Sequence, residues 1–149
     1  MKAWSKRTQE GMTLIEVLVA LVILGVGLLG AAAFQLNALK YTDSSRMTSQ
    51  ASFIAYDMLD RIRANSTADY TVNPPSSGNP GVARDQDLYD FNSNIVNFGG
   101  PSATGSITLS QRVYTITIEW DDSRAANAAD SRRSYVLSSR TAVDPVAAP

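Results

Sequence analysis

The sequence predicts an α+β fold in which one long N-terminal helix packs on a small antiparallel β-sheet of about three to four strands. Three features predict it. An apolar run of membrane length stands near the N-terminus, an apolar stripe with helical spacing follows it, and a strand-like alternation lies near the C-terminus. The first proline in the chain is Pro74, so no proline interrupts a helix before that position.

The first half of the long helix is the apolar run from Met12 to Phe34. At about 1.5 Å per residue it spans roughly 34 Å, enough to cross a hydrocarbon core of about 30 Å. A cleaved secretory signal has a shorter apolar core and a small-residue cleavage site after it, so we expect this run to stay as an anchor. Three basic residues precede it, which favours a cytoplasmic N-terminus and an exported C-terminal domain: Lys2, Lys6 and Arg7.

The second half of the helix is amphipathic. Five apolar residues recur at spacings of four, three, four and four, with Ala55 and Leu59 beside them: Met47, Ala51, Ile54, Met58 and Ile62. The pattern predicts one helix from Thr13 to Ala64, whose stripe covers the apolar face of the sheet. Asp57 and Arg61 stand four residues apart on the exposed side, where they can form a weak ion pair.

The rest of the chain reads as a loop, a short helix and strands. Proline, glycine, serine and asparagine dominate residues 66–83, which predicts a loop. Apolar residues at helical spacing predict a helix from Asp85 to Phe98, ended by Gly99, Gly100 and Pro101. Three strands are predicted at Ser106–Leu109, Arg112–Trp120 and Ser134–Thr141. Asp121–Ser131 is a polar connection between the last two, and Val143–Pro149 is a loose tail.

The composition narrows the possible functions. The chain has a formal net charge of −1, and the basic leader holds three cations and one anion, so the remainder carries −1 − 2 = −3. This balance gives no electrostatic case for nucleic-acid binding. The chain has no cysteine and no histidine, which excludes disulfides, Ser-His-Asp and Cys-His catalysis, and the usual zinc sites. We therefore predict no enzymatic activity, no cofactor, no metal and no small-molecule substrate.

Two groups of aspartates are candidates for metal or acid–base sites: Asp85, Asp87 and Asp90, and Asp121, Asp122 and Asp130. Neither group has the loop spacing or the closing glutamate of an EF-hand. We interpret both as solvated caps and turns.

A single carboxylate, Glu16, lies near the start of the apolar run. One interpretation is a tolerated glutamate at the membrane interface. The other starts from cleavage between Gly11 and Met12, which creates an α-amino group with an ordinary pKa of about 7.7–8.0. The new ammonium of a neighbouring subunit can then neutralise Glu16 in lipid and fix the axial register of two helices, so that Glu16 acts in assembly.

The segment from Gly11 to Leu18, behind its basic leader, resembles the type IV prepilin signature. The family has glycine before the cleaved bond and glutamate at the fifth mature position; its usual first mature residue is phenylalanine, where this chain has Met12. The resemblance implies cleavage after Gly11 by prepilin peptidase, N-methylation of Met12, and docking through Glu16. It implies residence in the inner membrane as a single-pass protein with a periplasmic C-terminal domain, followed by incorporation into a pilus at the cell surface.

Three further segments are similar to minor pilins of this family: 22–30 with Gln35 after it, 57–65 and 114–120. Major pilins commonly have a proline in the apolar helix and a C-terminal disulfide, and this chain has neither. The resemblance therefore implies a low-abundance subunit that helps initiate assembly with other minor pilins and the major pilin, in support of twitching motility, adhesion or DNA uptake. The alternatives are a minor pseudopilin of a type II secretion system, a pilus-tip adhesin, and an ordinary anchored periplasmic protein.

Gly25, Gly27 and Gly30 have two interpretations. They allow close helix packing in lipid, or they form a weak helical stretch that extends in the filament. Under the resemblance, the chain divides into five parts: a cleaved leader at 1–11, a transmembrane or filament-core half-helix at 12–34, an amphipathic half-helix at 35–65, a loop region with a short helix at 66–105, and the sheet with its tail at 106–149.

Overall fold

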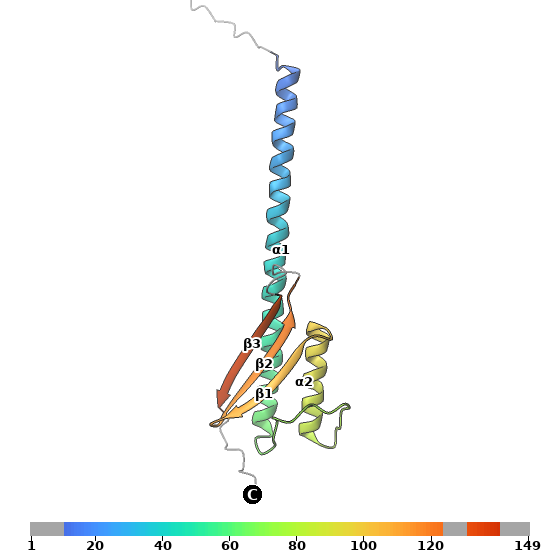
Figure 1. Ribbon diagram of the computed structural model, residues 1–149, viewed down its shortest axis with the longest axis vertical. Coiled ribbons are helices and arrows are strands. Elements are labelled where there is room, and N and C mark those ends of the chain that lie inside the picture. The colour runs from blue at the N-terminus through green and yellow to red at the C-terminus, as the bar shows by residue number, and fades with distance from the viewer. Residues whose placement is uncertain (1–10, 124–130, 141–149) are drawn as a thin grey trace, which may run out of the picture. The chain divides into compact units, whose positions relative to one another are not determined.

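The computed structural model describes residues 11–123 and 131–140. The elements follow in the order α1 (Leu14–Ala64), α2 (Ala83–Gly99), β1 (Thr104–Ser110), β2 (Val113–Asp121) and β3 (Arg132–Arg140) (Figure 1). A long N-terminal apolar helix and a small antiparallel sheet confirm the predicted α+β, pilin-like fold class. The chain divides into two compact units, one ending at Leu39 and one beginning at Lys40.

The first unit holds the apolar start of α1. The main-chain N–H groups of Glu16 and Val17 donate to the carbonyl oxygen of Thr13 at 3.0 and 3.3 Å, and these bonds begin the helix one residue after its predicted start. Every residue from Gly11 to Leu39 is exposed. The helix is long and apolar enough to cross a membrane, and none of its apolar window is buried. An apolar helix that its own chain leaves uncovered is suited to lipid or to other helices.

The second unit is built on the remaining part of α1. The predicted stripe is confirmed, because Met47, Ala51, Met58 and Ile62 are buried in a core shared with the sheet and α2. Ala55 and Leu59, placed beside the stripe, are buried as well, whereas Ile54 is only half-buried. The buried face is therefore centred slightly to one side of the predicted stripe.

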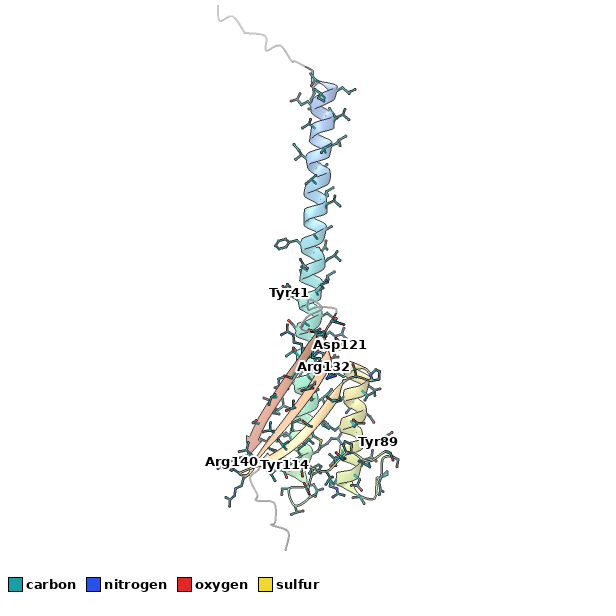
Figure 2. All side chains as sticks on the ribbon, in the orientation of Figure 1. Tyr41, Tyr89, Tyr114, Asp121, Arg132 and Arg140 are labelled. Atoms are coloured by element: carbon teal, nitrogen blue, oxygen red, sulfur yellow. The ribbon has the colours of Figure 1, made fainter. Side chains whose placement is uncertain are left out.

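The three strands form one antiparallel sheet in the order β1-β2-β3. The alternation predicted for β2 is confirmed: its inward-facing side chains are 0–1% exposed, and they are Tyr114, Ile116, Ile118 and Trp120. The register pairs Asp121 with Arg132 at one end of the sheet and Val113 with Arg140 at the other. Asp121, Arg132 and Arg140 are labelled in Figure 2. The two-residue turn Gln111–Arg112 has positive φ at both residues, as the right-handed twist of a tight hairpin requires.

The strand bounds differ from prediction by up to two residues. β1 begins at Thr104 because Thr104 and Gly105 pair with Glu119 and Ile118, although Gly105 has no side chain to mark it as a strand residue. β3 begins at Arg132 for the same reason, since Arg132 and Arg133 pair with the end of β2. Backbone pairing, which side-chain alternation does not report, sets these ends. Thr141 and the tail from Val143 lie outside the described residues.

Helix α2 begins at Ala83, two residues before its predicted start, because the carbonyl oxygen of Val82 accepts bonds from the N–H groups of Asp85 and Gln86. It includes Gly99, one residue beyond its predicted end. A Cβ at Gly99 would lie 2.6 Å from that of Ala103 and 2.9 Å from that of Trp120, so only glycine fits where α2 meets β2.

Candidate assembly site and the α1–α2 clamp

The predicted processing site lies at the start of α1. Gly11, Met12 and Thr13 precede the helix without regular secondary structure, and Met12 is 72% exposed. A protease needs an extended, accessible segment around the bond that it cleaves. The bond between Gly11 and Met12 meets this requirement. Residues 1–10 of the predicted leader lie outside the described residues.

Glu16 is in the first turn of α1 and is exposed. A carboxylate is favourable at this end because the helix dipole places partial positive charge there. It lies one turn beyond Met12, and the side chains that follow it as far as Phe34 are apolar or absent. The structure thus brings Gly11, Met12 and Glu16 into one short segment.

Gly25, Gly27 and Gly30 are interior residues of α1, the first about 13 Å along the helix from Glu16. A Cβ at any of the three would meet no atom within 4 Å. No packing among the described residues therefore explains three glycines that each weaken a helix by about 1 kcal/mol relative to alanine. Two explanations are left. Either their small size allows a neighbouring helix to pack closely, or their weak helix propensity allows this stretch of α1 to extend.

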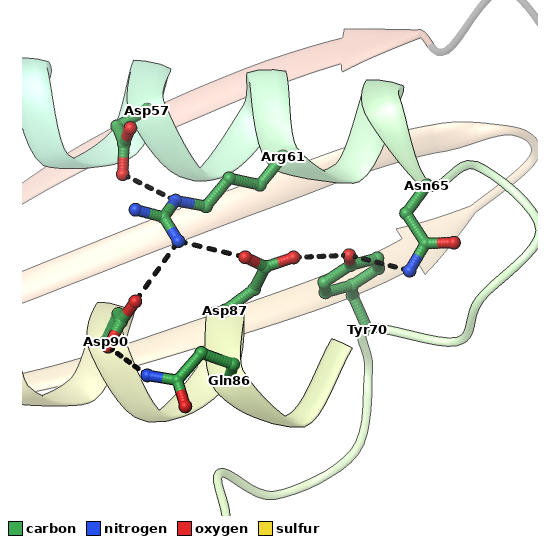
Figure 3. Close-up of polar contacts among 7 residues, drawn as sticks. All are labelled: Asp57, Arg61, Asn65, Tyr70, Gln86, Asp87 and Asp90. Atoms are coloured by element: carbon green, nitrogen blue, oxygen red, sulfur yellow. Dashed lines mark hydrogen bonds and ion pairs between the residues drawn. The ribbon is translucent and has the colours of Figure 1, made fainter. Parts of the chain in front are cut away.

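A second constellation, which we call the α1–α2 clamp, consists of Arg61, Asp57, Asp87, Asp90 and Tyr70 (Figure 3). Arg61 donates from Nε to Asp57 at 2.9 Å, and from Nη1 to Asp87 at 2.9 Å and Asp90 at 3.3 Å. The predicted Asp57–Arg61 pair is thus confirmed, but the same guanidinium also crosses to α2. The carboxylates around it raise the pKa of Arg61, with the hydrogen bond to Asp87 as the largest cause.

The buried phenol of Tyr70 extends the clamp into the loop after α1. Its hydroxyl donates to Asp87 Oδ2 at 2.8 Å and accepts a hydrogen bond from Asn65 Nδ2 at 3.2 Å. Burial and the neighbouring Asp87 carboxylate raise the pKa of Tyr70 to about 12. The clamp therefore connects both helices and the loop between them.

The interpretation of the first aspartate group as solvated caps and turns is wrong. All three residues lie within α2 and have side-chain partners: Asp85 pairs with Arg84 at 2.7 Å, Asp87 pairs with Arg61, and Asp90 accepts from Gln86 at 2.7 Å. The partner Arg61 is 26 residues from Asp87 in sequence, a contact that local spacing does not reveal.

In the second group, Asp121 is exposed at the end of β2, but Asp122 is only 4% exposed. Ser44 of α1 donates to Asp122 Oδ2 at 2.6 Å, and Arg133 lies 3.8 Å from the same oxygen. Asp122 therefore attaches the end of the sheet to α1 and is not a solvated turn residue. Asp130 lies outside the described residues.

Comparison with known protein families gives a match at the start of the chain. Residues 6–32 match the family model of the prokaryotic N-terminal methylation motif, a type IV pilin-like leader. No curated protein and no solved structure matches the chain. The matched segment contains Gly11, Met12, Glu16 and the three glycines, so every residue of the predicted assembly site lies inside it.

The fold is of the pilin-like class, its first residues match the methylation motif, and α1 is long and apolar enough to cross a membrane. The motif belongs to structural proteins, and its leader implies processing by prepilin peptidase and assembly with pilus components.

Proposed function

We propose that this chain is a minor pilin of a type IV pilus, of the PilV type, which enters the filament at low abundance and helps initiate its assembly. The observation that carries the proposal is the exposed Gly11–Met12 junction with Glu16 one turn later, inside the methylation motif and at the start of an uncovered apolar helix. The PilV-like segments 22–30 (with Gln35 after it), 57–65 and 114–120 support the narrower assignment. The apolar helix has no proline and the chain has no cysteine, which supports it as well.

In this proposal the chain first resides in the inner membrane with its leader, residues 1–11, in the cytoplasm. Prepilin peptidase cuts after Gly11, and the new N-terminus at Met12 is methylated. Residues 12–34 then pass from lipid into the filament core, while residues 35–65 and the sheet form the exported domain. Residues 12–34 are all exposed and nearly all apolar, so this segment suits both surroundings. Lipid tails and other apolar helices are about equally favourable neighbours for it.

Glu16 supplies specificity in that transfer. A carboxylate within an apolar helix is unfavourable in lipid by an amount that falls toward the interface. A neighbouring subunit's N-terminal ammonium neutralises it, and because the two charges occupy fixed positions along their helices, the contact also fixes the axial register. The partner is another minor pilin or the major pilin.

Gly25, Gly27 and Gly30 serve the same transfer. With no side chain and open space around each, they allow a neighbouring helix to approach closely. Local extension of this stretch in the filament remains the second role, since three glycines lower helix propensity together.

The proposal includes no catalytic step, no cofactor and no small-molecule substrate. The output of the pilus is twitching motility, adhesion or DNA uptake. A minor pseudopilin of a type II secretion system carries the same leader chemistry and is the second candidate, favoured by the motif match as much as a pilin is. Deletion separates the two: loss of pili supports the pilin, and loss of protein secretion with normal pili supports the pseudopilin.

The tip adhesin and the ordinary anchored protein are further alternatives. A deletion strain that keeps its pili and loses attachment favours the adhesin. A chain whose leader stays uncleaved favours the anchored protein.

The variant Glu16→Ala tests the assembly role. We expect the variant to be processed and membrane-bound but lost from sheared filaments, with fewer pili per cell. Glu119→Ala is the matched control, because it removes a glutamate from an exposed face of β2, far from the leader in sequence. Unchanged pilus number and incorporation in Glu16→Ala cells would show that Glu16 has no role in docking.

A further inference from the structure

Strand β3 forms an open edge of the sheet. The strand order β1-β2-β3 places β2 in the middle, and β3 pairs with β2 alone. Helix α2 packs on β1 and β2 and lies away from β3 (Figure 1). The other edge of the sheet is bordered by residues 70–74, which line a small cavity together with Gly105, Ser106 and Ile107 of β1. Among the described residues, β3 is therefore the strand whose outer edge nothing borders.

The open edge determines the shape of a partner that fits it. In an edge strand, part of the backbone N–H and C=O groups bond to the neighbouring strand, and the others point outward without a partner. No backbone group of β3 bonds to a described backbone group outside the sheet. Because β3 is nine residues long, it presents a long row of such groups. An extended chain matches this row with its own free backbone groups, whereas the backbone groups of a helix are already bonded.

The edge is positively charged at both ends. Strand β3 contains three arginines and no acidic residue: Arg132, Arg133 and Arg140. Arg132 lies 3.6 Å from Glu119, and Arg133 lies 3.8 Å from Asp122, yet both arginine side chains are more than half exposed. Arg140 is exposed and forms no ion pair with another described residue. A partner with carboxylates near these positions therefore has the complementary charge.

A second copy of β3 fits this edge poorly. Val136 is the central residue of the strand, so in a full-length antiparallel pair Arg132 of each copy lies opposite Arg140 of the other. In a parallel pair in register, each arginine lies beside the same arginine of the other copy. Like charges that face each other across two strands destabilise the pair, whereas opposite charges stabilise it. The charges therefore disfavour self-pairing and favour an acidic strand.

The middle of β3 is uncharged. Val136 is 56% exposed on the outer face of the sheet, between the exposed Ser134 and Ser138. On the other face, Tyr135 and Leu137 are partly buried against the core. A β-branched apolar residue on the added strand would lie beside Val136 and cover it. The strand that fits best is therefore acidic at its ends and apolar at its centre.

We propose that β3 binds an extended acidic segment of a partner protein, which joins the sheet as a fourth strand. The backbone of the segment pairs with the open edge, and carboxylates near its two ends face Arg132 and Arg140. Apolar residues at its centre cover Val136. The proposal is independent of the proposed role in a pilus.

The test uses the full chain, labelled with ¹⁵N, in nanodiscs of zwitterionic phosphatidylcholine, and follows the backbone amide resonances of β3. The probe is acetyl-Asp-Thr-Thr-Val-Val-Val-Thr-Thr-Asp-amide. We expect saturable shifts with a Kd of about 1 mM or less. The outward-facing amides of β3 should exchange with solvent at least about tenfold more slowly when the peptide is bound, whereas the amides that bond to β2 should change little.

Two further peptides separate the contributions of charge and of backbone pairing. A basic peptide, with Lys in place of both Asp residues, should bind about tenfold more weakly, because both charge pairs change from attractive to repulsive. An acidic peptide that is N-methylated from its second to its eighth residue keeps every side chain but loses its central donors. It should also bind at least about tenfold more weakly.

One variant and a matched control locate the contact on β3. Arg140→Gln should weaken binding of the acidic peptide about threefold and reduce the preference for the acidic over the basic peptide. Arg46→Gln removes the same charge from an exposed position of α1, and it should bind as the parent does. The backbone spectrum of each variant establishes that it is folded.

Four results would overturn the proposal. Equal binding of the acidic and basic peptides would show that charge does not select the partner. Equal binding of the N-methylated peptide would show that no strand pairing occurs, and an absence of shifts at about 10 mM peptide would exclude even weak binding. Slow exchange of the outward-facing amides without peptide would show that the edge is already covered, by a second copy if it depends on protein concentration and by this chain itself if it does not.

Discussion

Arg61 Nη1 lies 2.9 Å from Asp87 Oδ1, and this contact joins α1 to α2 across a sequence separation of 26 residues. The side chain of Asp87 is only 16% exposed, so Arg61 and the hydroxyl of Tyr70 replace much of the water that would otherwise hydrogen-bond its carboxylate. The clamp therefore holds α2 beside the C-terminal part of α1. Its contribution to the free energy of unfolding can be measured directly.

Arg61→Ala should lower the free energy of unfolding by about 1–3 kcal/mol, because it leaves a largely buried carboxylate without its cation. The measurement is denaturant unfolding of the full chain in detergent, followed by near-ultraviolet circular dichroism. The control is Arg63→Ala, two residues along the same helix. Arg63 pairs with the exposed Asp60, and its loss should change stability by about 0–1 kcal/mol. Equal losses in the two variants would contradict the clamp.

The raised pKa of Tyr70 leads us to expect that the folded chain loses stability at high pH. Its pKa is about 12 in the folded chain and about 10 when unfolded, so the fold favours the neutral phenol. This stabilisation is fully present below about pH 10 and is lost as the pH rises toward 12. The pKa values of Tyr114 and Tyr135 are also raised, so the parent alone does not isolate Tyr70.

The comparison with Tyr70→Phe isolates this contribution. The variant should be less stable at pH 8 by about 1 kcal/mol, since it loses the hydrogen bond to Asp87. Its deficit should shrink between pH 10 and pH 12, because the parent loses its advantage there. A constant deficit across this range would show that Tyr70 titrates alike in the folded and unfolded chains.

Gly105→Ala should destabilise the second unit by about 1–3 kcal/mol through overpacking. A Cβ at Gly105 would collide with Ile95 Cδ1 and with the ring of Phe91, where α2 meets β1. The adjacent change Ser106→Ala, on an exposed position of the same strand, should be nearly neutral. Thermal unfolding of the two variants checks this, and a Gly105→Ala chain as stable as Ser106→Ala would mean that α2 moves aside freely.

Gly11→Val should block removal of the leader, because a branched side chain next to the cleaved bond hinders entry into the peptidase. Intact-mass measurement of membrane-extracted protein should find only chains that retain residues 1–11. Gly27→Ala, in the interior of α1, should be cleaved normally. Normal cleavage of Gly11→Val would place the processing site elsewhere.

The residues of the proposed assembly site are neighbours in sequence, so a local pattern is enough to propose them. Gly11, Met12 and Glu16 fall within six positions, and the motif match covers them all. The same holds for the stripe from Met47 to Ile62, whose helical spacing alone places it on one face. Local periodicity carries this information because the helix repeat is fixed.

The clamp was not predictable in this way. Arg61 and Asp87 come from helices separated by a long loop, and only the fold brings them together. Burial of Asp122 was missed for the same reason, since its partner Ser44 is 78 residues away. Single-sequence reasoning treats an aspartate between strands as solvated and has no signal for a distant partner.

The most direct test of the proposed function is mass spectrometry of filaments sheared from the native cells. The account predicts a low-abundance peptide that begins at N-methylated Met12, which establishes both processing and incorporation. A processed chain confined to the cell envelope and absent from sheared filaments would contradict the minor-pilin assignment, and a chain that retains Gly11 would contradict the processing site itself.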